Sequence, residues 1–151
     1  GPRAVSALFI VTALILVLSS FFKGNKTYGR LTPLDGLVIG IAQGVGVFPG
    51  ISRSGITIAG CLATGMEREK AGEFAFLLAI PAILGALILE LPDMGGLFSV
   101  VNPFLLTISS LTAFMVGIAS LLILLPIVRH GKLAWFAVYL LPAGILGLTL
   151  M

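Results

Sequence analysis

Long runs without any charged side chain alternate with short polar stretches along the chain. Charge-free runs cover residues 4–22, 97–128 and 133–151, and a shorter apolar run covers 74–89 with Pro81 inside it. A helix that crosses the hydrocarbon core of a bilayer, about 30 Å thick, needs about 20 apolar residues. Spanning helices also tolerate an internal proline when neighbouring groups satisfy the freed carbonyl. The pattern predicts four spanning helices, at residues 4–22, 72–89, 104–127 and 133–150.

The composition agrees with a membrane protein. Of the 151 residues, 58% are hydrophobic and only 10% are charged, and so few charges cannot coat a water-facing surface. We therefore expect an all-α polytopic membrane protein that forms a single membrane domain over residues 1–151. Membrane topology explains the net charge of +3 better than nucleic-acid binding does. The single cysteine, Cys61, is expected to pack as a small apolar residue, and His130 to belong to a charged loop.

Residues 35–65 differ from the spans, because two apolar pieces meet at the sequence Phe48-Pro49-Gly50. Proline lacks a backbone donor and disfavours helix at the preceding residue, whereas glycine permits a turn. Each piece has about 12 to 14 residues, too few to cross a bilayer. The segment predicts a broken helical hairpin that re-enters the side from which it came, and one long broken helix that crosses is the alternative. Small residues at four-residue spacing predict close helix packing within protein. They are Gly36, Gly40 and Gly44 on the first arm and Gly55, Ala59 and Ala63 on the second.

The basic residues distinguish these two arrangements. If the hairpin returns, the lysines and arginines outside it divide seven to one, with only Arg3 on the minority face; if it crosses, they divide three to five. Cytoplasmic loops of membrane proteins carry the excess of Lys and Arg. The count therefore favours the returning hairpin, with loops 23–34, 66–70 and 128–132 in the cytoplasm. The seven residues are Lys23, Lys26, Arg30, Arg68, Lys70, Arg129 and Lys132.

The second arm of the hairpin opens with Ser52, Arg53 and Ser54, and Thr57 follows one turn later. Ser52 is suited to cap the helix, whose first-turn N–H groups then point toward the hairpin tip. Helix donors, hydroxyls and a guanidinium form an anion site, and the planar fork of arginine bonds two phosphate oxygens at once. An unpaired arginine at mid-depth costs at least about 2.5 to 3.5 kcal/mol, so Arg53 requires a partner. A structural role stays open, in which Arg53 bonds carbonyl groups or a buried carboxylate.

The stretch PGISRSGIT, residues 49–57, resembles the PGxSRSGxT signature of the bacitracin-resistance family, the undecaprenyl-diphosphate phosphatases. The preceding IGIAQGVGVFPG and the following FAFLLAIPAILGA resemble the same family, and the similarity covers essentially the whole chain. The resemblance is to the C-terminal half, the second of two inverted repeats that each contain a re-entrant hairpin. It implies a multi-pass protein of the bacterial plasma membrane that hydrolyses undecaprenyl diphosphate to the monophosphate with Mg²⁺ or Ca²⁺. This reaction recycles the carrier lipid of peptidoglycan synthesis. The resemblance also implies that the complementary N-terminal repeat is a partner of this chain.

The resemblance also implies roles for individual residues at the hairpin tip. A first set of residues, the catalytic group, would hold the diphosphate and donate hydrogen bonds to its oxygens. A second set, the substrate-binding group, would line the substrate site. The catalytic group is Arg53, Ser52, Ser54 and Thr57, and the substrate-binding group is Pro49, Gly50, Gly55 and Gln43.

The chain departs from the family pattern in its acidic residues. The first repeat of the family carries glutamates where Gln43 and Val47 stand here, so the metal-binding and acid–base carboxylates are absent. Glu73 is the nearest acidic residue, and it is expected to interact with its own helix dipole rather than with a metal. We therefore expect no metal ligands in this chain and no hydrolysis by the chain alone. The opening Gly1-Pro2, without an initiator Met, predicts a processed chain or a fragment.

Two other functions remain open from the sequence. One is a transporter or flippase module for an anionic lipid, which would bind phosphate at the broken hairpin without cleaving it. The other is a purely structural helix bundle. Release of phosphate from a polyprenyl diphosphate separates the phosphatase from both.

Overall fold

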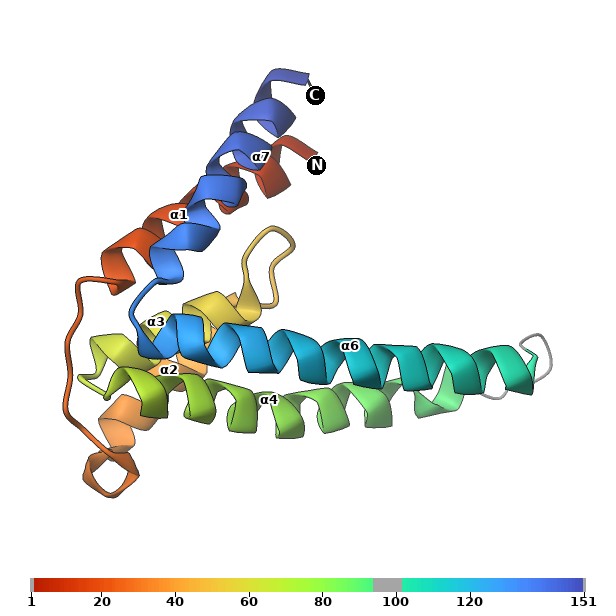
Figure 1. The fold of residues 1–151 in the computed structure, drawn as a ribbon, viewed down its shortest axis with the longest axis horizontal. Coiled ribbons are helices and arrows are strands. Elements are labelled where there is room, and N and C mark those ends of the chain that lie inside the picture. Colours follow the sequence, from red (N-terminus) through yellow and green to blue (C-terminus); the bar gives the residue numbers. More distant parts are fainter. Residues whose placement is uncertain (1, 94–101, 151) are drawn as a thin grey trace.

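The computed structural model describes residues 2–93 and 102–150, and these residues form helices joined by short loops (Figure 1). The described part of the chain contains no β-strand. The predicted all-α fold is therefore confirmed. The α-helices are α1 (Pro2–Ser19), α2 (Pro33–Val45), α3 (Arg53–Ala63), α4 (Arg68–Glu90), α6 (Pro103–Arg129) and α7 (Ala137–Leu150), and the 3₁₀ helices are η1 (Tyr28–Arg30), η2 (Leu91–Asp93) and η3 (Leu133–Phe136).

Four of the helical segments are long and apolar enough to cross a membrane, as the sequence predicts. They are Pro2–Ser19, Arg68–Glu90, Pro103–Arg129 and Leu133–Leu150. Helix α4 begins at Arg68, before the first residue of the predicted span, and keeps Pro81 inside it. Helix α6 begins at Pro103, where the Asn102 side chain accepts a hydrogen bond from the Phe104 N–H at 2.9 Å. These four segments make the chain a multi-pass membrane protein.

The two short helices α2 and α3 form an antiparallel hairpin. Its ends lie side by side, because Lys26 N–H donates to Gly65 O and Glu67 N–H donates to Lys26 O, each at 3.0 Å. At the other end, a Cβ on Gly46 would lie 2.8 Å from the Cα of Arg53. A hydrogen-bonding capping box between Thr32 and Asp35 starts α2. The chain thus returns to its starting point, which is the geometry that a re-entrant hairpin requires.

The small residues of the two arms behave differently. On α3, a Cβ on Gly55 would lie 3.0 Å from Leu16 Cδ2, so this helix packs closely on α1. On α2, Gly36, Gly40 and Gly44 have no neighbouring atom within 4 Å of such a Cβ. The expectation of close packing is therefore wrong for the stripe on α2 within this chain. Cys61 is fully buried beside other apolar residues of α3, as the sequence predicts.

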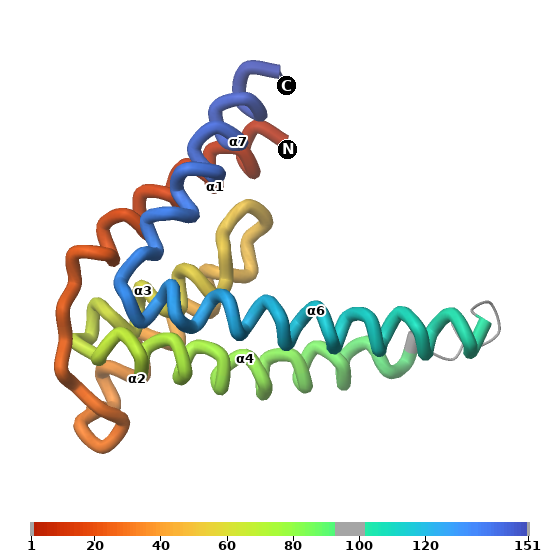
Figure 2. Tube along the Cα trace, in the orientation of Figure 1, coloured from red at the N-terminus to blue at the C-terminus, as the bar shows by residue number. Residues whose placement is uncertain are grey.

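The long helices form two pairs that diverge from the hairpin, α1 with α7 and α4 with α6 (Figures 1 and 2). Glycines bring α1 and α7 together, since a Cβ on Gly144 would lie 2.6 Å from Ile10 Cγ1 and one on Gly147 would overlap the Ser6 hydroxyl. The same figures place the turn between α2 and α3 on the side of the hairpin that faces α1 and α7. Helix α1 is therefore the element that supports the hairpin tip.

The loops that carry the seven basic residues meet at one end of the fold. The Arg68 guanidinium donates to the carbonyls of Ser20 and Phe22 at the end of α1. Arg129, at the end of α6, pairs with Glu69 at 3.2 Å. These contacts bring residues 20–32, 64–70 and 128–133 together. The basic residues of these three loops therefore lie together at one end of the fold, which we call the basic end.

Glu73 belongs to this basic end and not to the hairpin tip. Its carboxylate accepts hydrogen bonds from the Tyr28 hydroxyl at 2.7 Å and from Lys70 Nζ at 2.8 Å. Partial burial, and then the hydrogen bond to Glu73, raise the pKa of Tyr28 to about 12. His130 lies in the adjacent loop, where its Nδ1 is 2.6 Å from Pro126 O. Side-chain contacts with Tyr28 and Lys70, rather than the helix dipole alone, therefore fix Glu73.

We expect the chain to insert in a single orientation, with this basic end in the cytoplasm. Single cysteines at Lys23 and at Asp93, in a Cys61→Ala background, test this in intact cells with a membrane-impermeant thiol reagent. Only the Asp93 site should react, and lysis should expose the Lys23 site. The loop that follows Asp93 continues into residues 94–101, which lie outside the described residues. Equal labelling at both sites in intact cells would mean dual insertion.

Candidate functional site

The turn between α2 and α3, residues 46–52, is built around Gly50. Its φ is +97°, a conformation that residues with a side chain rarely adopt. A Cβ there would lie 2.6 Å from Val5 O and 2.9 Å from Leu8 Cβ. The Thr12 hydroxyl also donates to Gly50 O at 3.2 Å, and Thr12 is buried. The hairpin tip is thus held directly on the backbone of α1.

We expect Gly50→Ala to lower the unfolding free energy, because it combines an unfavourable φ with a clash against backbone. Backbone strain of this kind costs on the order of 1–3 kcal/mol. Gly29→Ala is the matched control, since φ there is not positive and no atom lies within 4 Å of the added Cβ. Thermal unfolding in detergent measures both variants. Equal melting temperatures for Gly50→Ala and Gly29→Ala would contradict this account of the turn.

Ser52 caps α3, as the sequence predicts. Its hydroxyl oxygen accepts a hydrogen bond from Gly55 N–H at 3.2 Å. The Ser52 carbonyl accepts from Ile56 N–H at 2.9 Å, the first bond of the helix. The N–H groups of Arg53 and Ser54, at the first two helical positions, have no carbonyl partner within a helix. The start of α3 therefore presents backbone donors together with the partial positive charge of the helix dipole.

Arg53 is the first residue of α3, and its side chain is exposed. Within residues 2–93 and 102–150, the guanidinium takes part in no ion pair and no side-chain hydrogen bond. The backbone of Gly46 packs against the base of this side chain, since a Cβ there would lie 3.0 Å from Arg53 Cγ. The hairpin thus holds the Cα and Cγ atoms of Arg53 in place, and the guanidinium stays available to bind a ligand. Neither form of the structural alternative, a bond from Arg53 to carbonyl groups or to a buried carboxylate, is found in the described part of the chain.

A cavity of about 280 Å³ lies beside Arg53 and brings together four of the predicted residues. Gln43 of α2 and Arg53, Ser54 and Thr57 of α3 line it, and α4 forms the facing wall with Ala75, Phe76 and Ala79. The Thr57 hydroxyl donates to Arg53 O at 2.7 Å, so it is available to a ligand only as an acceptor. Gln43 Nε2 donates to Leu78 O at 3.2 Å and ties α2 to α4. We call this space the Arg53 cavity.

The other predicted residues lie on the opposite side of the first turn of α3. Gly50, Ser52 and Gly55 line a second cavity, and Ser54 lines both. Pro49 is exposed in the turn itself. Gly50 and Gly55 permit close approach to α1 and offer no side-chain donor. The structure therefore places Arg53 and Ser52 at different cavities on the two sides of the first turn of α3, and the two glycines bring that turn against α1.

Thr12 is the residue at the tip that sequence reasoning missed. It is one of four hydroxyl residues within the apolar run 4–22 and lies six positions after the buried Ser6. A buried hydroxyl in an apolar helix is costly unless it makes a hydrogen bond. A threonine within an apolar run therefore indicates that an acceptor lies nearby. The acceptor, Gly50 O, lies 38 residues away and cannot be found from spacing alone.

The Arg53 cavity does not suit a divalent cation by itself. Mg²⁺ and Ca²⁺ take oxygen ligands, with carboxylates prominent among them, and the lining residues of this cavity include no Asp or Glu. Among the described residues, no group of three His, Cys, Asp or Glu side chains is placed to hold a metal. The cationic guanidinium of Arg53 would also oppose a metal there. The arrangement instead suits an anion with several oxygens.

Comparison with known proteins adds to this geometry. Residues 1–146 match the family described as Bacitracin resistance protein BacA. An undecaprenyl-diphosphatase of Treponema denticola is 49% identical over 148 residues, covering 98% of this chain and 55% of that protein. Proteins of the same name from Thermosipho africanus and Corynebacterium efficiens are 44% and 42% identical, covering 91% and 93% of this chain and 53% and 52% of those proteins. The chain spans about half the length of the curated relatives it matches. With a family match over nearly its whole length, the chain belongs to the BacA family of bacitracin resistance proteins.

Proposed function

We propose that this chain forms the second half of an integral-membrane undecaprenyl-diphosphate phosphatase of the bacterial plasma membrane. The observation that supports it most directly is the guanidinium of Arg53 at the start of α3, which has no ion-pair or side-chain hydrogen-bond partner among the described residues. It lies beside Ser54 in a cavity that α4 also lines. The curated relatives carry the name of this activity. The reaction would recycle the lipid carrier of cell-wall precursors.

In this proposal the diphosphate lies in the Arg53 cavity. The guanidinium would bond two phosphate oxygens at once, and the Ser54 hydroxyl and first-turn N–H groups of α3 would donate to others. Negative charge shifts between phosphate oxygens during phosphoryl transfer, and fixed donors aimed at those oxygens lower the barrier. Gln43 would present its Oε1 to bound water, while its amide nitrogen holds Leu78 O.

The metal ion and the acid–base carboxylates would come from residues outside this chain. The Arg53 cavity supplies no carboxylate, and the relatives contain about as much sequence again. The open stripe of Gly36, Gly40 and Gly44 on α2 offers a surface on which a further helix can pack closely. We propose that the complementary repeat, inserted in the opposite sense, packs there.

Phosphate release from undecaprenyl diphosphate by the purified full-length protein tests this function. We expect release that depends on Mg²⁺ or Ca²⁺ and stops with chelator. The alternative function, transport of an anionic lipid, predicts saturable binding of the same lipid and no phosphate release. That outcome would replace the phosphatase with a lipid-binding module.

A further inference from the structure

The Thr12 hydroxyl makes a hydrogen bond outside its own helix. Thr12 lies within α1, is 2% exposed, and donates to Gly50 O in the hairpin turn at 3.2 Å. Threonines in helices often donate to a carbonyl of their own preceding turn, and the other helical threonines among the described residues do so. They are Thr57, Thr107, Thr112 and Thr149. The bond to Gly50 therefore takes the place of an intrahelical bond that α1 would otherwise provide.

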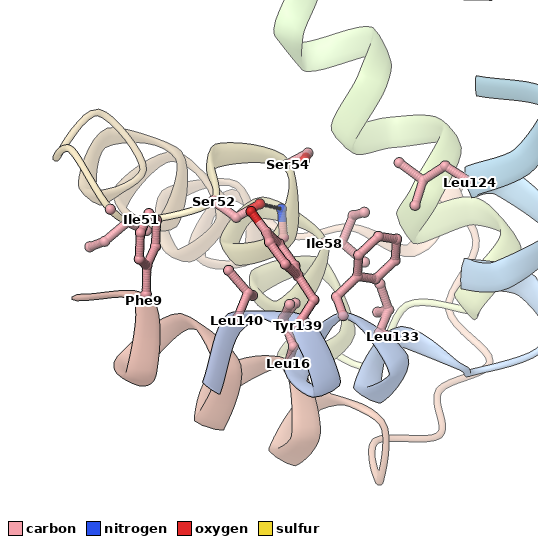
Figure 3. A pocket seen from close by; sticks show the side chains of 13 residues that line it. Phe9, Leu16, Ile51, Ser52, Ser54, Ile58, Leu124, Leu133, Tyr139 and Leu140 are labelled. Carbon is pink, nitrogen blue, oxygen red and sulfur yellow. Dashed lines mark hydrogen bonds between the residues drawn. The ribbon is translucent and has the colours of Figure 1, made fainter. Parts of the chain in front are cut away.

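The face of α1 that carries Thr12 runs along the hairpin tip. Leu16, one turn after Thr12, packs on Gly55 in the first turn of α3. Figure 3 shows Leu16 on the α1 side of that turn, where the dashed line marks the bond from Gly55 N–H to Ser52. Such apolar contact sets the spacing between the two helices but has no direction. The Thr12 bond is directional, and Gly50 O accepts no other hydrogen bond from the described residues.

The peptide group that Thr12 holds lies close to Arg53 along the chain. Only Ile51 and Ser52 separate Gly50 from Arg53, and Ser52 is the cap of α3. A rotation of the peptide after Gly50 would therefore change the direction in which α3 begins. On its other side, the Arg53 backbone lies against Gly46, where a Cβ would be 2.8 Å from Arg53 Cα. The start of α3 is thus held from two sides, by the first arm of the hairpin and by α1.

We infer that Thr12 is a positioning residue for Arg53. Its hydroxyl fixes the peptide after Gly50, so that the guanidinium keeps the direction in which it meets a phosphate. The inference rests on the proposed function for the ligand at Arg53. A misplacement of about 1 Å at a reacting group can cost roughly 10²-fold in rate. The loss of one hydroxyl leaves the apolar contacts with α1 in place, so its effect should be smaller than that of removing Arg53.

Thr12→Val in the full-length protein removes the hydroxyl and keeps a side chain of similar shape. We expect kcat for undecaprenyl diphosphate to fall by roughly tenfold, equivalent to about 1.4 kcal/mol. Thr12→Ser keeps the hydroxyl and should restore most of the rate. The matched control is Thr112→Val, because the Thr112 hydroxyl donates to Ile108 O of its own helix at 2.8 Å. This control should leave kcat unchanged.

Two results would overturn the inference at this stage. One is a folded Thr12→Val that turns over as fast as Thr112→Val. The other is a folded Thr12→Ser that is as slow as Thr12→Val, since the hydroxyl would then not be the group that matters. Thermal unfolding of each sample identifies a variant that fails to fold. Thr12→Ala replaces Thr12→Val if valine is not accommodated.

A double-mutant cycle tests whether Thr12 acts through Arg53. In an Arg53→Ala background, Thr12→Val should lower kcat little further, because no guanidinium remains to be positioned. A purely structural role of Thr12 predicts the same fold-change in both backgrounds. Equal fold-changes would therefore contradict a positioning role.

The same cycle can be measured without turnover. Calorimetric titration of farnesyl methylenediphosphonate, which resists hydrolysis, gives the dissociation constant for each of the four proteins. Coupling in binding without phosphate release would overturn the phosphatase and leave the positioning role intact. Phosphate release that needs Arg53 but not Thr12 would leave the phosphatase intact and overturn the positioning role. The absence of both release and coupling would overturn both proposals.

Discussion

Replacing Arg53 by alanine in the full-length protein is expected to lower kcat for polyprenyl diphosphate hydrolysis by roughly 10²-fold or more. The guanidinium is free of protein partners within the described residues, so it is available to oxygens that gain charge in the transition state. For the same reason its removal should leave the melting temperature nearly unchanged. The measurement is phosphate release at saturating lipid, together with thermal unfolding of the same sample.

Arg30→Ala is the matched control for this variant. Arg30 is another exposed arginine, located in η1 at the basic end rather than at the hairpin tip. Its substitution should leave kcat within a few-fold of the parent protein. If Arg53→Ala and Arg30→Ala turned over equally well, Arg53 would have no part in the chemistry.

Arg53→Lys is expected to remain strongly impaired. Lysine keeps the charge but presents a point donor, whereas arginine offers two parallel N–H groups to two oxygens. Recovery of most of the activity by lysine would show that charge alone is needed at this position.

The second large effect concerns the chain by itself. We expect the 151-residue chain, purified alone, to release no phosphate from polyprenyl diphosphate above background. The residues that line the Arg53 cavity include no carboxylate that could bind a metal or move a proton. Co-expression with the remaining part of the full-length protein should restore release. Metal-dependent release from the chain alone, abolished by chelator, would mean that Gln43 or Glu73 has a catalytic role.

Much of the fold follows from the sequence because the bilayer limits the choices. A backbone in hydrocarbon must satisfy its own hydrogen bonds, so long charge-free runs form helices. The break at Pro49 and Gly50 likewise indicates the hairpin, since proline and glycine restrict the backbone locally. The clustering of basic loops could be predicted because the positive-inside rule acts on sequence alone.

The contacts between distant segments could not be predicted in the same way. The open stripe on α2 and the packed stripe on α3 have similar spacing in the sequence, and only their neighbours distinguish them. The bond between Thr12 and Gly50 joins α1 to the hairpin turn, and the bond between Gln43 and Leu78 joins α2 to α4. The division of the predicted site into two cavities also depends on which side of α3 each residue occupies. Helical periodicity determines which residues of α3 share a side of the helix. It does not identify which other helices face that side.

The central claim is that the start of α3 binds a diphosphate through Arg53. Calorimetric titration of farnesyl methylenediphosphonate into the full-length protein measures this without any chemical step. The account predicts that Arg53→Ala weakens binding by at least roughly tenfold, since hydrogen bonds to charged groups contribute about 1.5–3 kcal/mol, while Arg30→Ala binds like the parent. An unchanged dissociation constant for Arg53→Ala would contradict the account.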